Sequence, residues 1–194
     1  FGFKGVRAAA VSQRDFAIYR MPQSMLRAVS MGLPVIMLTA FFGAGSAGQY
    51  SLVLLCLSAP VMLLGDSVGE VFYPKITRAI NNQTGKAFAL INKAVLVLFI
   101  VGIAPFGFMA AFGDIVLPWV FGAEWVLAGQ YSQWVAFWMI SMLAVRPAVA
   151  AMPALKLQSA LLIYEIVISF GRISALYIGY LQANDIVAIA LFSL

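Results

Sequence analysis

Charged side chains are scarce in this sequence, and several lie inside or at the edge of long apolar runs. The stretch LLGDSVGEVFYPKI, residues 63–76, holds two carboxylates one helical turn apart, Asp66 and Glu70. Residues 51–62 before it, SLVLLCLSAPVM, carry no charge. Charges within a membrane are costly and are candidates for function. The chemistry to look for is therefore ion pairing, gating and the binding of a charged substrate.

Helix geometry places the two carboxylates at one edge of a membrane. The first two apolar runs form an antiparallel hairpin that turns near Gly45. At 1.5 Å per residue, Arg27 lies about 27 Å from this turn, Asp66 about 31 Å and Glu70 about 37 Å. All three reach the edge of a hydrocarbon core about 30 Å thick, and Arg27 is at the depth to pair with Asp66. We expect either a salt-bridge gate or a solvated helix end with a packing glycine pair.

Arg146 and Glu165 lie deeper. They are nine and ten residues from a turn near Leu155, which puts both about 14 Å from it, near the middle of the membrane. Opposite charges at one depth on neighbouring helices are expected to pair. Such a pair serves either structure or function.

Arg172 follows Glu165 by seven residues, on nearly the same helix face and about 10 Å further out. No acidic residue of the sequence occupies its depth, so this arginine needs an anion from elsewhere. A guanidinium suits phosphate because its planar fork donates two parallel hydrogen bonds. We predict a substrate contact at Arg172.

Composition bounds the class of protein. Of the 194 residues, 63% are apolar and 10% are charged, whereas a soluble domain carries about 25% charged residues. The chain is therefore expected to be a polytopic membrane protein. It has no histidine and one cysteine, Cys56, which disfavours metal sites, Cys/His catalysis and disulfides. We expect neither an enzyme nor a cofactor, and leave a coupling ion open.

Apolar runs of about 20 residues predict an all-α bundle of membrane-spanning helices, since continuous apolar runs exclude a β-barrel. The predicted spans are 23–43, 47–69, 94–113, 131–153 and 157–181, with an incomplete sixth at 184–194. Because the sixth is short, we expect the chain to be part of a larger protein. Prolines inside four spans predict kinks, as in transporters with broken helices: Pro34, Pro60, Pro105 and Pro147.

The connections separate by charge. One side carries Lys4, Arg7, Arg14, Arg20, Lys75, Arg78, Lys86, Lys93 and Lys156, and the other carries Asp114, Glu124 and Asp185. The positive-inside rule therefore places residue 1 and the 74–93 loop in the cytoplasm. This distribution explains the net charge of +5 without a nucleic-acid partner.

Two connections are predicted to have structure of their own. Residues 75–93, KITRAINNQTGKAFALINK, resemble a surface helix broken at Asn81–Gly85. Residues 113–131, with Trp119, Trp125 and Tyr131, are typical of an interfacial turn. We favour an aromatic belt at headgroup level over ligand stacking for these rings.

Four ordered blocks resemble the O-antigen (Wzx-type) polysaccharide flippases of the multidrug/oligosaccharidyl-lipid/polysaccharide exporter superfamily. The blocks are RDFAIYRMPQ (14–23), LPVIMLTAFFGAGSAGQYSL (33–52), LGDSVGEVFYPKI (64–76) and VFGAEWVLAGQYSQWVAFW (120–138). The likeness runs from about residue 14 to the end of the chain. It consists of packing and turn blocks and includes no catalytic signature.

The resemblance implies a two-lobe transporter of about twelve helices around a cationic cavity. Residues 1–22 would be the cytoplasmic lobe linker and 23–194 the C-terminal lobe, partnered by an N-terminal lobe in the bacterial cytoplasmic membrane. Its substrate would be undecaprenyl-diphosphate-linked oligosaccharide, moved by alternating access. Such a cavity would bind the diphosphate through arginines, and the candidates are Arg172, Arg27 and Arg146. From the positions of the charges, the candidates for gates or ion pairs are Asp66, Glu70 and Glu165.

Other functions stay open. A drug/cation antiporter of the same superfamily would prefer acidic residues deep in a cavity, and Asp66 and Glu70 are too shallow for that. A membrane glycosyltransferase or polymerase would need catalytic residues in sizeable outer loops, where only Asp114 and Glu124 occur. A non-transporting membrane subunit predicts that the buried arginines are replaceable.

Overall fold

The computed structural model describes residues 21–81, 87–152, 155 and 157–193, and this part of the chain is helical apart from short turns. The helices are α2 (Met21–Phe42), α3 (Ala44–Asn81), α4 (Ala87–Phe121), the short 3-10 helix η2 (Ala123–Trp125), α5 (Val126–Ala151), α6 (Gln158–Leu181) and α7 (Asp185–Ser193). The predicted all-α class is confirmed. Residues 1–20 of the expected linker lie outside the described residues.

Within the described residues, five stretches are long and apolar enough to cross a membrane: α2, α3, α4, η2 with α5, and α6. This fits the predicted multi-pass membrane protein. The bounds of α2 and α6 agree with the expected spans 23–43 and 157–181 to within two residues. The described part of the expected sixth span is the nine-residue helix α7.

Helices α3 and α4 are longer than the apolar runs that predicted them. They contain 38 and 35 residues, which corresponds to roughly 57 and 52 Å of helix, well beyond a hydrocarbon core of about 30 Å. The prediction of a separate surface helix at 75–93 is therefore wrong. Its first part is the end of α3, its last part is the start of α4, and residues 82–86 lie outside the described residues. Ile76, Ile91 and Ala151 form a small buried cluster there.

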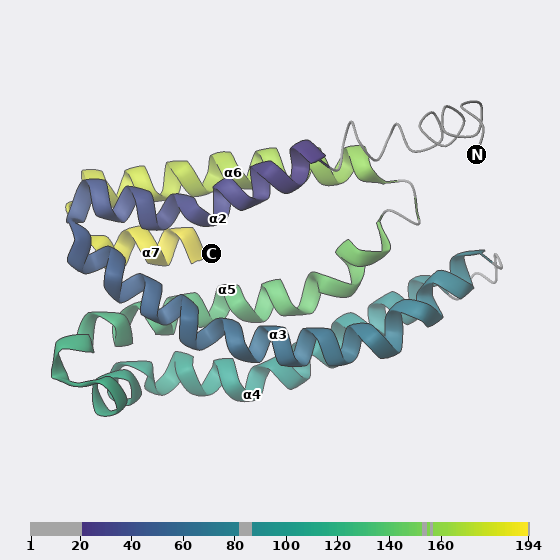
Figure 1. Ribbon diagram of the computed structural model, residues 1–194, viewed down its shortest axis with the longest axis horizontal. Coiled ribbons are helices and arrows are strands. Elements are labelled where there is room, and N and C mark those ends of the chain that lie inside the picture. The colour runs from purple at the N-terminus through teal and green to yellow at the C-terminus, as the bar shows by residue number, and fades with distance from the viewer. Residues whose placement is uncertain (1–20, 82–86, 153–154, 156, 194) are drawn as a thin grey trace, which may run out of the picture.

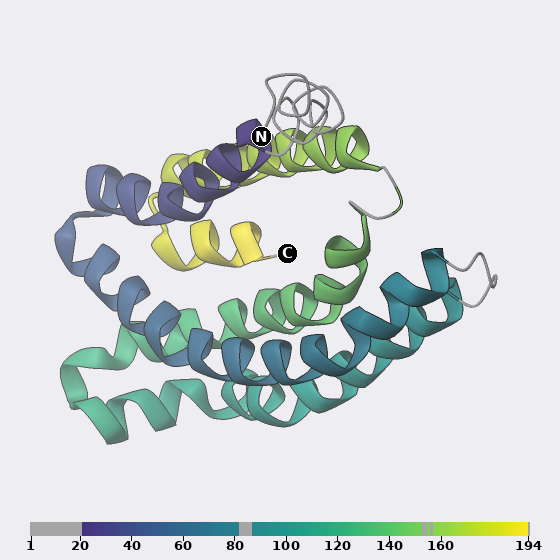
Figure 2. The same cartoon turned by 45° about the vertical axis from the view of Figure 1, so that its right-hand side comes forward.

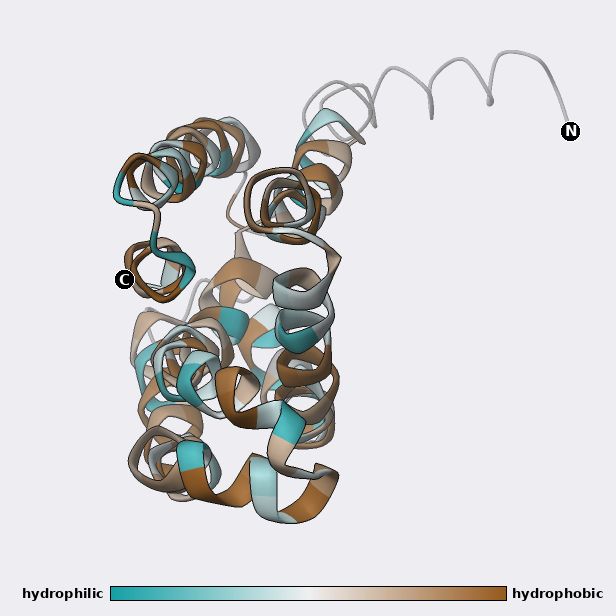
Figure 3. Cartoon of the chain, turned by 90° about the vertical axis from the view of Figure 1, so that its left-hand side faces the viewer, coloured by the Kyte–Doolittle hydropathy of each residue, from teal (hydrophilic) through white to brown (hydrophobic). Residues whose placement is uncertain are grey.

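The helices form two groups, α2 with α6 and α7, and α3 with α4 and α5 (Figure 1). The groups meet where Gly43 joins α2 to α3, which we call the Gly43 end. They diverge toward the opposite end, which carries Lys75 and which we call the Lys75 end (Figures 1 and 2). Gly43 has a φ of 92°, a left-handed conformation that glycine adopts without a steric penalty. Seen from the Gly43 end, hydrophobic residues predominate on both groups (Figure 3).

The main core lies among α3, α4 and α5. Helix α3 contributes Tyr50, Val53, Leu57 and Val61, all buried, at the spacing of three and four that marks one helix face. At the Gly43 end, a Cβ on Gly129 of α5 would come within 2.7 Å of the Asp114 Cα of α4. Small residues at this crossing let the two backbones approach closely.

The four span prolines lie within continuous helices. The last turns of α5 turn toward α6 (Figure 2), while Ala151 at the end of the helix stays packed against Ile76 of α3. Proline produces such bends because it removes one backbone hydrogen bond and clashes with the preceding turn.

Candidate functional site

Two cavities bring the predicted site residues together. The Arg172 cavity has a volume of about 490 Å³ between α2, α5, α6 and α7, and its lining includes Arg27, Arg172, Glu165, Ser141, Ser193, Trp138 and Phe192. The Asp66 cavity has a volume of about 700 Å³ between α3, α4 and α5, and its lining includes Asp66, Glu70 and Arg146. The expected residues thus divide into two sets.

Helix α6 turns its charges inward. Its buried stripe consists of Leu161, Glu165, Ser169 and Leu176, and Arg172 lies on the same stripe at helical spacing. The opposite face carries exposed apolar side chains such as Val167 and Phe170, as expected for a face in contact with lipid. The sequence argument that Glu165 and Arg172 share a face is confirmed.

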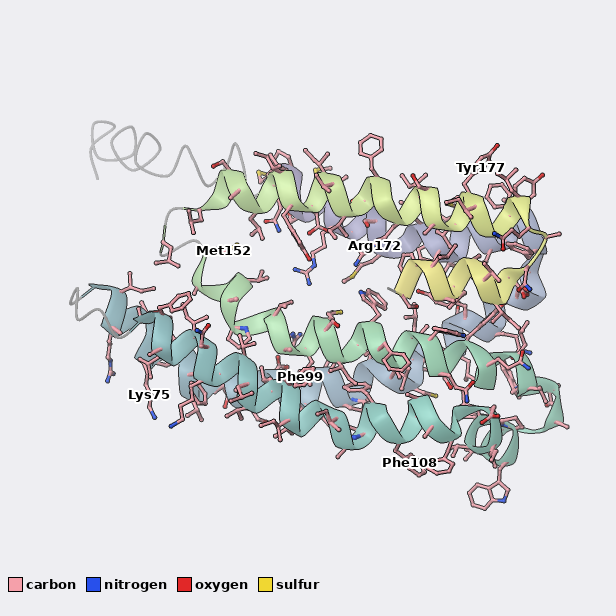
Figure 4. The ribbon with its side chains drawn as sticks, turned by 180° about the vertical axis from the view of Figure 1, so that it is seen from behind. Lys75, Phe99, Phe108, Met152, Arg172 and Tyr177 are labelled. Carbon is pink, nitrogen blue, oxygen red and sulfur yellow. The ribbon has the colours of Figure 1, made fainter. Side chains whose placement is uncertain are left out.

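Arg172 contacts three other helices. Its Nη1 donates a hydrogen bond to the Ser30 hydroxyl of α2 at 3.1 Å. The guanidinium carbon lies 5.4 Å from the ring centroid of Trp138 in α5 and 5.3 Å from that of Phe192 in α7, both within cation–π range. The side chain points from α6 toward the interior (Figure 4). It thereby connects the two helix groups, and among the described residues Ser30 is the one hydrogen-bond partner of the guanidinium.

Arg27 and Glu165 complete the charges of the Arg172 cavity. Arg27 enters it from α2 and Glu165 from α6. The Arg172 guanidinium interacts electrostatically with both, favourably with Glu165 and repulsively with Arg27. Two guanidinium groups and one carboxylate give this described lining a net charge of +1. The cavity is therefore an anion-attracting space enclosed by apolar helices.

Arg146 has a different partner from the one predicted. Its Nη1 lies 3.3 Å from Asp66 Oδ1 and donates to the Val61 carbonyl oxygen at 3.1 Å. The expected pairs Arg146–Glu165 and Arg27–Asp66 are therefore corrected to Arg146–Asp66, which joins α5 to α3. Glu70 lies beside this pair in the same cavity.

The predicted partner of Arg146 was wrong because the depth of Arg146 was counted from the wrong end of its helix. Gln49 of α3 and Ala128 of α5 are hydrogen-bonded at the Gly43 end, so they mark one common level. Asp66 follows Gln49 by 17 residues and Arg146 follows Ala128 by 18, or about 26 and 27 Å along the two helices. Counting from Leu155 misses this level because it compares Arg146 with α6, whereas the neighbour that Arg146 contacts is α3.

Sequence reasoning also missed the polar contacts at the Gly43 end. Gln49 Nε2 donates to the Glu124 carbonyl at 2.7 Å, and its Oε1 accepts from the Ala128 N–H at 3.0 Å. Ser46 donates to Asp185 Oδ2 at 2.9 Å. The available signal was the pair of polar residues Ser46 and Gln49 at the start of an otherwise apolar run. These bonds tie α3 to α5 and to α7.

Compared with protein-family models, with curated proteins and with solved structures, the chain matches none of them. The family resemblance consequently rests on the four sequence blocks, and the chemistry of the site rests on the two cavities.

Proposed function

We propose that the chain is part of a flippase that moves undecaprenyl-diphosphate-linked oligosaccharide across the bacterial cytoplasmic membrane by alternating access, in the synthesis of O-antigen for lipopolysaccharide. The observation that carries this proposal is the Arg172 cavity. It is a cationic space within a bundle of membrane-length helices, formed by Arg172 and Arg27.

A diphosphate fits this cavity on physical grounds. Keeping a guanidinium inside hydrocarbon is expensive, and such a charge is stabilised where it faces an anion or water. Arg172 uses one N–H on Ser30, and its fork retains donors for a phosphate oxygen. Arg27 supplies a second charge in the same cavity. Two guanidinium groups match the two phosphates of the proposed headgroup.

In this proposal Arg146 does not bind substrate while it is paired with Asp66. Its Nη1 contacts Asp66 and the Val61 carbonyl, so Arg146 reaches substrate only when Asp66 releases it. Asp66, with Glu70 beside it, would then act as a gate between α3 and α5. Glu165 belongs to the substrate cavity rather than to that gate.

The direction of transport follows from the charges of the two ends. Lys75, Arg78 and Lys93 lie at the Lys75 end, and Glu124 and Asp185 lie at the Gly43 end. With positive charge inside, the Lys75 end is cytoplasmic, and the cavity accepts substrate there. The separation of the helix groups toward this end supports entry from the cytoplasm.

A drug/cation antiporter is the second candidate, and one observation favours it. Glu165 is 6% exposed and lines the Arg172 cavity, which supplies the deep acidic residue that such a transporter needs. However, Arg27 and Arg172 share this lining and repel a cation. The net charge of the described lining therefore favours an anionic substrate.

The test is glycan export by the intact gene product in a bacterium that lacks its own flippase. Arg172→Ala should reduce export at least tenfold while membrane abundance stays unchanged, because the phosphate loses its charged hydrogen bonds. Arg172→Lys should retain partial export, since lysine keeps the charge and loses the planar fork. Arg78→Ala, exposed and outside both cavities, is the matched control.

Full export by Arg172→Ala would reject the proposal and favour a non-transporting subunit. A second measurement uses purified protein and undecaprenyl diphosphate in detergent. Binding should weaken in Arg172→Ala and in Arg27→Ala and stay unchanged in Arg78→Ala.

A further inference from the structure

A carboxylate does not suit a site that binds only phosphate, because the two groups carry the same charge. Glu165 is 6% exposed and lines the same cavity as Arg27 and Arg172. At this position its negative charge opposes a phosphate and lowers the positive potential that attracts one. Glu165 therefore requires a role that the diphosphate does not provide.

Among the described residues no arginine, Arg27 included, lies within salt-bridge distance of Glu165, although the Arg172 guanidinium attracts it electrostatically. Arg146 forms a salt bridge with Asp66. Arg172 lies two helical turns from Glu165, about 10 Å along α6, and its guanidinium is held by Ser30, Trp138 and Phe192. Among the described residues, the carboxylate has no salt-bridge partner. Its acceptor oxygens are therefore available to a ligand in the cavity.

Ser193 provides a second, independent polar group. Its side chain is 6% exposed and lines the Arg172 cavity from α7. Its hydroxyl oxygen is buried without a hydrogen-bond partner among the described residues. A buried polar group left unpaired is destabilising, so this hydroxyl also favours a ligand that can bond to it.

The chemistry of these two groups selects the ligand. An ionised carboxylate only accepts hydrogen bonds, and a serine hydroxyl both donates and accepts. A phosphate offers acceptors alone and is repelled by Glu165, whereas an organic cation is repelled by the two arginines. A neutral group rich in hydroxyls satisfies both Glu165 and Ser193 without either repulsion.

We propose that Glu165 and Ser193 bind the hydroxyls of the sugar that is linked directly to the diphosphate, while Arg172 and Arg27 bind the phosphates. This inference rests on the proposed function and adds to it the residues that distinguish the glycan-bearing carrier from the bare carrier lipid. The cavity of about 490 Å³ is within the usual range of small-molecule sites. A site built to bond hydroxyls discriminates strongly against an analogue that lacks them.

The inference predicts opposite effects of one substitution on two lipids. Glu165→Gln should weaken binding of the glycan-loaded lipid about tenfold, because charge-assisted hydrogen bonds to the sugar are lost. The same change should strengthen binding of bare undecaprenyl diphosphate several-fold, because the cavity gains positive charge. A merely structural role for Glu165 would weaken binding of both lipids together.

The experiment measures binding of both lipids to the purified intact gene product. The glycan-loaded lipid is extracted from a host strain that lacks this protein, and bare undecaprenyl diphosphate is the second probe. Ser193→Ala should weaken binding of the loaded lipid alone. Ser58→Ala is the matched control, because Ser58 lies on α3 outside the lining of both cavities and its hydroxyl donates to Leu55 of its own helix at 3.1 Å.

The outcomes separate the two proposals. If Glu165→Gln changes binding of both lipids in the same direction, or of neither, the sugar-binding role is overturned and the flippase proposal stands. If the unmodified protein binds neither lipid, the flippase proposal fails and takes this inference with it. Opposite shifts on the two lipids support both.

Discussion

At the scale of single residues, Gly65 explains how Arg146 fits against α3. A Cβ at Gly65 would overlap Arg146 Nη1 and would come within 2.9 Å of Arg146 Cδ. One turn further along α3, a Cβ at Gly69 meets nothing within 4 Å. These two glycines were expected to serve packing alike, yet only Gly65 makes room for a charged side chain.

Replacing each glycine by alanine should therefore separate them. Alanine raises helix propensity by up to about 1 kcal/mol at both positions. At Gly65 it also displaces Arg146 from Asp66 and from the Val61 carbonyl, which costs about 1–2 kcal/mol for two partly exposed bonds. Gly65→Ala should thus be about 1–2 kcal/mol less stable than Gly69→Ala, measured by denaturant unfolding in micelles.

The control for this prediction is Arg146→Ala. Without the guanidinium, alanine at Gly65 no longer displaces it, so the difference between the two glycine variants should shrink to a few tenths of a kcal/mol, on the order of the error in such comparisons. A difference that persists in the Arg146→Ala background would mean that Gly65 acts through some other neighbour.

At the scale of elements, Gln49 acts as a capping residue for a helix to which it does not belong. The first N–H groups of α5 have no partner within the helix, and Trp125 at its N-cap position provides no side-chain bond. Gln49 Oε1 accepts from Ala128, the third residue of α5, at 3.0 Å. The α3–α5 register, and with it the Asp66–Arg146 pair, follows from this contact.

Gln49→Met should lower the free energy of unfolding by about 1–2 kcal/mol. Methionine keeps the length of the side chain, and the Ala128 N–H loses its acceptor, a loss comparable to removing a helix cap. Ser51→Ala is the control on the same helix, because the Ser51 hydroxyl donates to the Ala47 carbonyl of α3 itself at 2.8 Å. Equal unfolding midpoints for the two variants would contradict the capping role.

The sequence predicted most elements but not how they meet. Apolar runs indicate only the part of a helix that lies within hydrocarbon. They therefore predicted the bounds of α2 and α6 closely but underestimated the lengths of α3 and α4, which continue beyond the hydrocarbon at Ile76 and Ile91. The shared face of Glu165 and Arg172 was predictable because both lie on one helix. The partner of Arg146 was not, since it depends on a register set by Gln49 on another helix.

At the scale of the whole molecule, the Arg172 cavity lies between the two helix groups, which meet at the Gly43 end and diverge toward the Lys75 end (Figures 1 and 2). The separation of the two helix groups cannot be predicted from any periodicity in the sequence. The charges within the apolar runs indicated only that the bundle encloses a polar cavity. The proposed transport cycle needs the two ends to face opposite sides of the membrane. Lys75 and Glu124, both exposed, mark these ends.

Cysteines at Lys75 and Glu124, in a Cys56→Ser background, should react with a charged, membrane-impermeant maleimide from opposite sides. Intact cells should label Glu124→Cys, and inverted vesicles should label Lys75→Cys, because lysine and arginine concentrate in cytoplasmic loops. Leu55→Cys is the internal control: Leu55 is 70% exposed in mid-span, and a thiol facing hydrocarbon stays protonated and unreactive toward a reagent that cannot enter. Labelling of both cysteines from one side would mean that both ends face the same side of the membrane. Substrate would then have no route across it through the Arg172 cavity.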